Sequence, residues 1–286
     1  MRSRRGGRTL DLVQADILSY RPEPESVDVI MTSPPYKDED GWTRELMYAL
    51  GKVAREALRP GGRLFVNLGQ LRGNYDRPMR SWGAIRTSGL KPGQTIAWVK
   101  SAVVPSWREA VLEALRDPDC TPEMVRKILE APGRPTQRGH YTPITLKSPT
   151  LNYGWEFVFT FWKPPERAMD RLSIGVPHTD PSNRDRGTRG KHGGLHCAGD
   201  VWVIPYRTTG AKTKKTTAGL QGAYSFPDEL ARRAIKLCGL EPGSTVMDPF
   251  CGGGTVLRVA RELGHDAVGI DLNREALKVA WKTWAG

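Results

Sequence analysis

The stretch Val246–Val256, VMDPFCGGGTV, decides the fold of this 286-residue chain, because a short apolar strand runs into a glycine turn that opens directly into a helix. Its three consecutive glycines, Gly252, Gly253 and Gly254, carry no Cβ atoms, so a ligand can approach the main chain closely at the end of the strand. The stretch matches neither the phosphate-binding pattern G-x-x-x-x-G-K-[ST] nor the strict dinucleotide pattern G-x-G-x-x-G.

A second acidic residue favours a nucleoside ligand at this turn. Asp271 follows the next apolar strand, Ala267–Ile270, 23 residues after Asp248. A carboxylate at that point of a strand–turn–helix–strand unit can accept hydrogen bonds from both ribose hydroxyls. We therefore predict a nucleoside cofactor between the glycine loop and Asp271.

Strands alternate with helices over most of the chain. β-Branched apolar runs predict strands, and apolar residues at helical spacing predict helices between them. Strands are expected at 9–19 (with a turn), 27–32, 63–68, 95–100, 156–163, 245–247 and 267–270, and helices at 43–58, 107–115, 122–129, 225–237, 255–263 and 273–284. Ser225 is expected to cap the helix that stops at Gly239, and residues 131–150 are expected to form a Pro/Gly-rich connector. This alternation predicts an α/β fold with a mostly parallel sheet.

A second motif, TSPPY at Thr32–Tyr36, follows the buried strand VDVIM and should lie at the carboxyl edge of the same sheet. Two successive prolines restrict the backbone, so the turn can direct the Ser33 hydroxyl and the Pro34 carbonyl into one small space. Two such acceptors can hold both N–H bonds of an exocyclic amine on a nucleobase, while Tyr36 stacks on the base. A duplex base would first be extruded, at a cost of roughly a few kcal/mol. An ordinary proline-rich turn is the alternative for SPP alone.

The net charge of +12 is concentrated in two places. Residues 1–8 carry four arginines and no acid, and residues 163–217 carry 11 basic and five acidic residues, whereas residues 218–286 are neutral overall. The central segment is either a solvated loop or a nucleic-acid contact that neutralises phosphates. We expect a DNA contact, made by Arg184, Arg186, Arg189 and Lys191.

Several other classes of protein and site are not expected. The four cysteines lie far apart with no CxxC pair, which argues against a disulfide framework. His192, His196 and Cys197 lie within six residues but lack a fourth zinc ligand at suitable spacing, so we expect no metal. Cys251 precedes three glycines and is not expected to be a nucleophile. Because no secretory h-region and no 18-residue apolar run are found, we expect a soluble, cytoplasmic protein without a membrane partner.

The two motifs together resemble one enzyme family. TSPPY after VIM resembles the signature of amino-DNA methyltransferases in its cytosine-N4-specific form, and DPFCGGGTV is similar to their S-adenosyl-L-methionine motif. LRPGG with RLFVNLG, IAWVK, WEFVFTFWK, DVWVIP and LEPGSTVMDPF resemble the connecting pieces, so the likeness covers residues 9–100, 153–163 and 200–284. The catalytic motif precedes the cofactor motif, an order that resembles the β group. The resemblance implies a Rossmann-like methyltransferase fold with a circularly permuted motif order and a mixed seven-stranded sheet.

The resemblance also implies roles for individual residues. The catalytic loop would be formed by Ser33, Pro34, Pro35 and Tyr36, and the cofactor would be bound by Asp16, Phe226, Asp248, Pro249, Phe250, Gly252, Gly253, Gly254, Thr255 and Asp271. Asp16 would accept a hydrogen bond from the cofactor adenine amine. Residues 1–163 would form the catalytic half with a helical insertion at about 101–150, residues 164–217 the basic target-recognition region, and residues 218–286 the cofactor-binding half.

We therefore predict a site-specific methyltransferase that transfers a methyl group from S-adenosyl-L-methionine to the N4 amine of cytosine in double-stranded DNA. Adenine N6 methylation by the same fold is the first alternative, because the two amines have nearly equivalent geometry. A non-catalytic DNA-binding protein and a methyltransferase acting on structured RNA are more distant alternatives. A cognate restriction endonuclease is a candidate partner, and the chain is expected to act as a monomer or weak homodimer.

Overall fold

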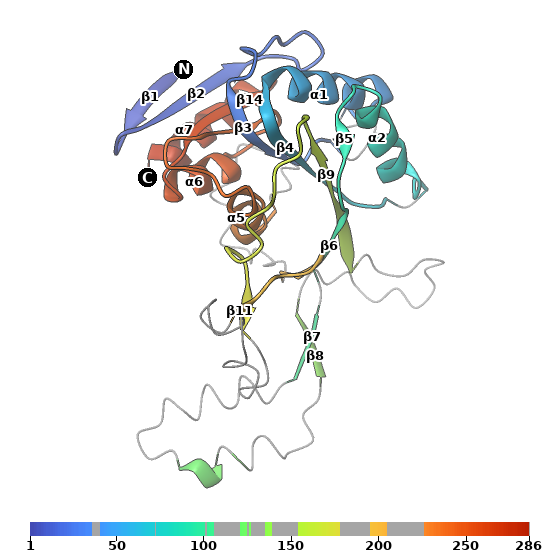
Figure 1. Ribbon diagram of the computed structural model, residues 1–286, viewed down its shortest axis with the longest axis vertical. Coiled ribbons are helices and arrows are strands. Elements are labelled where there is room, and N and C mark those ends of the chain that lie inside the picture. Colours follow the sequence, from blue (N-terminus) through green and yellow to red (C-terminus); the bar gives the residue numbers. More distant parts are fainter. Residues whose placement is uncertain are drawn as a thin grey trace.

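One large, mostly parallel sheet forms the centre of the molecule (Figure 1). The computed structural model describes residues 1–35, 41–71, 73–100, 102–105, 121–124, 126, 135–138, 154–177, 195–204 and 226–285. In spatial order, five parallel neighbours come first: β2 (Arg8–Gln14), β14 (Asp266–Asp271), β13 (Thr245–Asp248), β3 (Val27–Thr32) and β4 (Leu58–Leu68). Antiparallel β9 (Trp155–Trp162) follows, and then β6 (Ile96–Val99) and β12 (Val201–Val203), which are parallel to each other. The outer strand β1 (Arg2–Arg5) pairs with β2, and short β5 (Lys91–Pro92) pairs with β9.

Helices cover both faces of this sheet, so the strands are buried on two sides. One core forms beneath α1 (Arg44–Ala57) and α2 (Arg77–Arg86). The other forms beneath α5 (Asp228–Leu237), α6 (Thr255–Glu262) and α7 (Arg274–Ala285). Because side chains alternate along a strand, β3 sends Ile30 into the first core and Met31 into the second.

The chain leaves two adjacent central strands in opposite directions. From β13 it passes through α6 to β14, and from β3 it passes through α1 to β4 on the other side. The two helices therefore lie on opposite faces, which makes the carboxyl ends of β13 and β3 a topological switch point. Ligands of open α/β sheets bind at such a switch point, which makes this edge the candidate location of a site.

Most of the predicted elements are confirmed, and the exceptions have physical causes. Among the described residues the sheet has ten strands rather than the expected seven, because the short strands β1, β5 and β12 extend it. Helix α2 was not predicted, since its sequence RPMRSWGAIR contains a proline, a glycine and few apolar residues. The prediction that Ser225 caps α5 is wrong: the helix begins at Asp228, and the extended Pro227 is its N-cap.

Two antiparallel ribbons flank segments that lie outside the described residues. β10 (Val176–Pro177) pairs with β11 (Leu195–His196) at the two ends of 178–194, and β7 (Ala102–Pro105) pairs with β8 (Pro135–Arg138). The expected insertion at 101–150 is thus not purely helical, and its connector contains a strand. Of the two helices expected there, 107–115 lies outside the described residues, and only Pro122–Met124 and Arg126 of the second are seen as helical.

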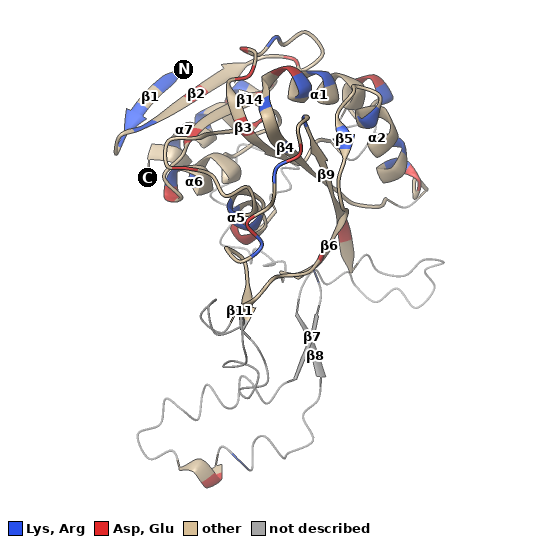
Figure 2. Cartoon of the chain, viewed as in Figure 1, with Lys and Arg blue, Asp and Glu red and all other residues tan. Residues whose placement is uncertain are grey.

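The basic N-terminal strand lies at the outer end of the sheet. Figure 2 shows the arginines of β1 at that end, and the sheet order places β12 at the other. Within the described part of the chain, no helix is long and apolar enough to cross a membrane.

Candidate functional site

Polar residues end or follow four adjacent parallel strands around the switch point. Asp16 comes shortly after β2, Asp271 ends β14, Asp248 ends β13, and Ser33 follows β3. Gln14 is in register with Asp271, and Asp248 with Gly269, so these strand ends lie nearly level. The structure therefore brings together three carboxylates and one hydroxyl from distant parts of the sequence.

The two halves of this edge are joined by a buried hydrogen bond. Thr32 Oγ1, at the end of β3, donates to Asp248 Oδ1 at 2.7 Å, across the switch point. The Phe250 main-chain N–H donates to the same oxygen at 3.1 Å. Thr32 was not among the predicted site residues, yet its hydroxyl holds the loop that follows β13 against the loop that follows β3.

Asp248 is almost completely enclosed, and this changes its ionisation. Burial raises the pKa of the Asp248 carboxyl to about 7, although hydrogen bonds from Thr32 and from the Phe250 main chain oppose the rise. The negative charge of Asp271 raises the pKa further. A cation brought next to this carboxyl would favour its ionised form.

Two residues of the glycine loop have open space beside them, and the third packs tightly. A Cβ atom on Gly252 would meet no atom within 4 Å, and one on Gly253 would meet only Val279 Cγ1 at 3.6 Å. Gly254 has φ +85°, and a Cβ there would lie 2.9 Å from Ala280 Cα. The first two positions therefore leave room for a ligand, whereas the third allows α6 to begin beside α7.

Asp271 is oriented by the loop that it faces. The Gly252 N–H donates to Asp271 Oδ2 at 2.9 Å, and the Asn273 N–H donates to Oδ1 at 2.8 Å. Asp16 is held in a similar manner, because the Leu18 N–H donates to its Oδ1 at 2.9 Å. Both carboxylates keep further lone pairs for a ligand.

The other predicted cofactor residues follow Asp248 or lie at the start of α5 and α6. Pro249 is buried, and Phe250 is half-buried against the core beneath α1 and α2. Phe226 is half-buried against the opposite core, just before α5, and Thr255 is the first residue of α6.

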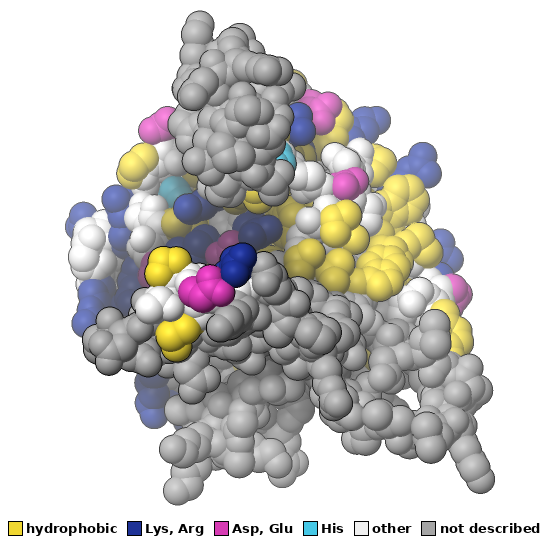
Figure 3. Space-filling view, turned by 90° about the horizontal axis from the view of Figure 1, so that it is seen from below, with side chains coloured by type: hydrophobic (Ala, Val, Ile, Leu, Met, Phe, Trp, Pro, Cys, Tyr) yellow, Lys and Arg dark blue, Asp and Glu magenta, His cyan; other side chains and the backbone are white. Residues whose placement is uncertain are grey.

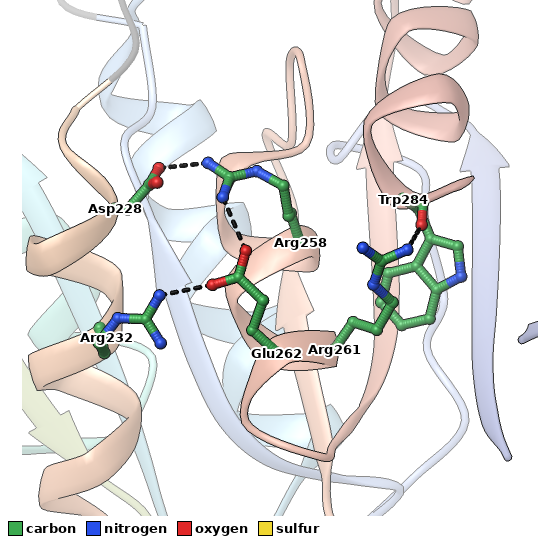
Figure 4. Close-up of polar contacts among 6 residues, drawn as sticks. All are labelled: Asp228, Arg232, Arg258, Arg261, Glu262 and Trp284. Atoms are coloured by element: carbon green, nitrogen blue, oxygen red, sulfur yellow. Dashed lines mark hydrogen bonds and ion pairs between the residues drawn. The ribbon is translucent and has the colours of Figure 1, made fainter. Parts of the chain in front are cut away.

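Ion pairs fix α5 relative to α6. Figure 4 shows Arg258 of α6 between Asp228 of α5 and Glu262, and Glu262 also contacts Arg232. These contacts hold the pKa of Glu262 below its ordinary value and raise the pKa of Arg258. In the same figure, Arg261 donates to the Trp284 carbonyl and connects α6 to α7.

Both ends of the Ser-Pro-Pro loop are anchored. Ser33 and Pro35 are half-buried and Pro34 is buried, whereas Tyr36 lies outside the described residues. The described chain resumes at Gly41, and Trp42 is buried, with its Nε1 donating to Ser81 Oγ at 3.0 Å. The guanidinium groups of Arg77 and Arg80 lie 4.5 and 5.0 Å from the Trp42 ring centroid. Sequence reasoning missed Trp42, because the partners that reveal its role belong to an unpredicted helix.

The structure also bears on the predictions for Cys251, for the histidine and cysteine cluster, and for the DNA contacts. Cys251 is buried, and burial together with Asp248 and Asp271 raises its thiol pKa well above the ordinary value, as expected of a packing residue rather than a nucleophile. The described residues, which include His196 and Cys197, contain no group of three or more His, Cys, Asp or Glu side chains that could hold a metal ion. His192 and the four predicted DNA contacts, Arg184, Arg186, Arg189 and Lys191, lie outside them.

The donor set fits the predicted cofactor. Carboxylates suit the hydroxyl groups of a ribose and the positive charge of a sulfonium nucleoside, and the open glycine main chain allows close approach. Asp271, Asp16 and Asp248 with the glycine loop would hold S-adenosyl-L-methionine, which supplies an activated methyl group when bound. The fold is that of an α/β protein, and its donor set makes the switch point a candidate nucleoside site.

Comparison with known proteins identifies the family. The DNA methylase family of N6 and N4 methyltransferases matches residues 27–282, and the chain belongs to this family. It is a β-group amino-DNA methyltransferase that uses S-adenosyl-L-methionine and acts on DNA.

Its relatives include Type II methyltransferases. The chain is 27% identical over 290 residues to M.SmaI of Serratia marcescens, with 90% of this chain and 84% of that protein covered. It is 27% identical over 301 residues to M.Cfr9I of Citrobacter freundii, with 94% and 85% covered.

Solved structures share the fold. PvuII DNA methyltransferase (cytosine-N4-specific) superposes with a TM-score of 0.60 at 16% identity, covering 96% of this chain and 86% of that one. The M1.HpyAVI complex with S-adenosyl-L-methionine superposes with a TM-score of 0.54 at 14% identity, covering 96% and 98%. These likenesses confirm the Rossmann-like fold.

We expect Gly254→Ala to lower the free energy of unfolding by about 2–4 kcal/mol, because the new methyl group combines a strained φ with a clash against the Ala280 backbone. The matched control Gly253→Ala should change it by less than about 1 kcal/mol, since its methyl group finds ordinary contacts. Chemical denaturation of both variants measures this, and equal losses would contradict the assigned geometry.

We expect Asp248 to make the folded protein less stable as the pH rises. An unfolded aspartate ionises near pH 4, whereas the folded Asp248 stays protonated to about 7, so its contribution is lost between these values. Asp248→Asn keeps an acceptor for Thr32 but cannot ionise. The unfolding free energy of the wild type minus that of Asp248→Asn should therefore fall by roughly 2–3 kcal/mol from pH 5 to pH 7.5. A constant difference in denaturation experiments would show that Asp248 ionises normally.

Proposed function

We propose that this methyltransferase acts on the N4 amine of cytosine at specific sequences in double-stranded DNA. The observation that carries the proposal is the position of Ser33-Pro34 directly after β3, beside the glycine loop at the switch point. Serine at the first position of this motif is typical of the cytosine-N4 form of the family, and PvuII DNA methyltransferase, which shares the fold, is named as cytosine-N4-specific.

The chemistry explains why such a loop is needed. An exocyclic amine is conjugated with the ring, and its lone pair is therefore a weak nucleophile. Ser33 Oγ and the Pro34 carbonyl would accept its two N–H bonds and favour a pyramidal nitrogen whose lone pair faces the methyl group. Tyr36 would stack on the extruded base, which offsets part of the cost of leaving the duplex. Orientation and electrostatics then supply the rate enhancement, without a covalent enzyme intermediate.

Adenine N6 methylation is the alternative, because both amines fit two acceptors. Plasmid DNA methylated in vitro and digested to nucleosides should contain N4-methylcytosine by mass spectrometry. N6-methyladenine as the only product would overturn the cytosine assignment.

We expect Ser33→Ala to lower kcat by about 10- to 100-fold, because one of the two acceptors for the amine is removed. The affinity for S-adenosyl-L-methionine should stay within about twofold, since the cofactor residues are untouched. Single-turnover methyl transfer and equilibrium cofactor binding measure the two effects. An unchanged kcat would remove Ser33 from the catalytic loop.

The basic segment is proposed to contact DNA. The four predicted contacts lie in residues 178–194, which follow β10 and precede β11, two strands that pair with each other. Figure 3, which views the molecule from that side, shows hydrophobic side chains gathered on one part of the face and basic ones on the rest of it and at its rim. Phosphate contacts would come from Arg184, Arg186, Arg189 and Lys191. The sequence recognised would depend on which side chains of the segment reach base edges.

Replacing Arg184, Arg186 and Arg189 by alanine should weaken DNA binding at low salt. It should also make the salt dependence flatter: the negative slope of log affinity against log salt should become less negative by roughly 0.9 for each phosphate that is no longer neutralised. The matched control removes three arginines of β1, Arg2, Arg4 and Arg5, at the far end of the sheet, and should have little effect. Fluorescence anisotropy at several salt concentrations measures both. Equal effects of the two variants would mean that only net charge matters.

A further inference from the structure

Four polar side chains continue one face of the sheet beyond its apolar core at the carboxyl edge. The core beneath α5, α6 and α7 contains Met31, Phe65, Trp98 and Val158. Because side chains alternate along a strand, the next positions toward the carboxyl edge on that face are Ser33, Asn67, Lys100 and Glu156. Ser33 directly follows β3, Asn67 is in β4, Glu156 is in β9 and Lys100 directly follows β6. These four strands are neighbours in this spatial order. Three of these residues have no role in the function proposed above.

These three residues form one buried network. Lys100 Nζ lies 2.6 Å from Glu156 Oε1, and Asn67 Nδ2 donates to Glu156 Oε2 at 2.9 Å. The Lys100 and Glu156 side chains are only 10% and 11% exposed, and Asn67 is 1% exposed. The network therefore crosses β4, β9 and β6 largely shielded from bulk water.

The orientation of the Asn67 amide follows from its partners. Its nitrogen also donates to the Phe157 carbonyl at 3.2 Å, so both N–H bonds point toward acceptors on β9. A flipped amide would place its oxygen against two other oxygens, and this excludes the alternative assignment. The carbonyl end of the amide dipole is therefore turned away from β9, toward the β3 side of the strand.

Stability alone does not account for this arrangement. A buried ion pair must be desolvated, and replacing such a pair by apolar residues of similar size is often neutral or stabilising. A fixed row of charges and dipoles is instead suited to stabilising a charge that develops during a reaction. The register of Thr32 with Val66 places Asn67 level with Ser33, where the reacting amine is proposed to lie.

We propose that Lys100 and Glu156 are positioning residues that act through Asn67 on the amine of the target base. Along the sheet the Lys100 ammonium comes first, then the Glu156 carboxylate, then the Asn67 amide. The amine of the target base would come last, beside Ser33, and neighbouring strands are about 4.8 Å apart. The carboxylate is one strand closer to Ser33 than the ammonium, and it polarises the amide so that the negative end faces the amine. This inference rests on amine methylation at Ser33, and it holds for cytosine N4 and adenine N6 alike.

The network acts on the charge that moves during transfer. The amine lone pair forms the N–C bond while the S–C bond breaks and its electron pair remains on sulfur. Positive charge thereby passes from sulfur to nitrogen, and one N–H proton then leaves to water. The Asn67 carbonyl dipole stabilises the nitrogen as it becomes positive and contributes little before transfer begins, so kcat should be affected more than KM.

Two variants test the network without leaving a buried charge unpaired. Asn67→Leu removes the dipole at nearly constant volume, and Lys100→Met with Glu156→Gln removes both charges. We expect single-turnover rates at saturating DNA and cofactor to fall by about 10- to 100-fold, with KM for DNA and the Kd of S-adenosyl-L-methionine within about threefold. Titration of cofactor-binding sites gives the rate per folded molecule.

The matched control is Arg59→Met, which breaks the 2.6 Å ion pair with Asp28 at the opposite, amino edge of the sheet and should leave the rate unchanged. Wild-type rates from either network variant would overturn the proposal, as would an equal fall in rate in Arg59→Met. Rates are compared with the wild type on whichever base it methylates. N6-methyladenine as the product would therefore overturn the cytosine assignment, while the rate ratio still tests the network.

Discussion

The hydrogen bond from Thr32 to Asp248 joins the two strands on which the rest of the site depends. It crosses a switch point of the sheet, where two neighbouring strands continue in opposite directions. On one side of the switch point lie the glycine loop and Asp271, and on the other lies the Ser-Pro-Pro turn. A methyl donor and a methyl acceptor must meet within bonding distance, and this edge allows both to approach from their own strand ends.

The sheet shows how the permuted motif order still brings the two motifs together. The last strands, β13 and β14, insert between the first two long ones, β2 and β3, so segments more than 200 residues apart are direct neighbours. Ion pairs between α5 and α6 and the Trp42 anchor under α2 then support the two loops from opposite faces. Each loop is held by contacts outside itself, which is what reacting groups require if they are to keep a productive geometry.

Local patterns predicted most of the elements and failed where tertiary contacts decide. The strands at 27–32 and 245–248 and the helices at 44–57 and 255–262 were expected within a residue or two. Their apolar residues form clear patterns, and glycine or proline residues mark one or both ends. Helix α2 has little periodicity and is stabilised by packing on β9 and Trp42. The strands β1, β5 and β12 are too short to be distinguished from loops and exist because a partner strand is available beside them.

The sequence by itself determined which chemical groups occupy the candidate site: a glycine turn, acids at the strand ends, and a serine held by two prolines. Each of these features is formed by residues that are adjacent in the chain, so a local pattern reveals it. Only the tertiary structure decided which groups support that edge. Thr32 and Asp248, Trp42 and Ser81, and the network of Asn67, Glu156 and Lys100 join residues that are 39 to 216 positions apart. No local pattern marks such pairs, because what selects them is the register of neighbouring strands and the burial that makes an unpaired polar group costly.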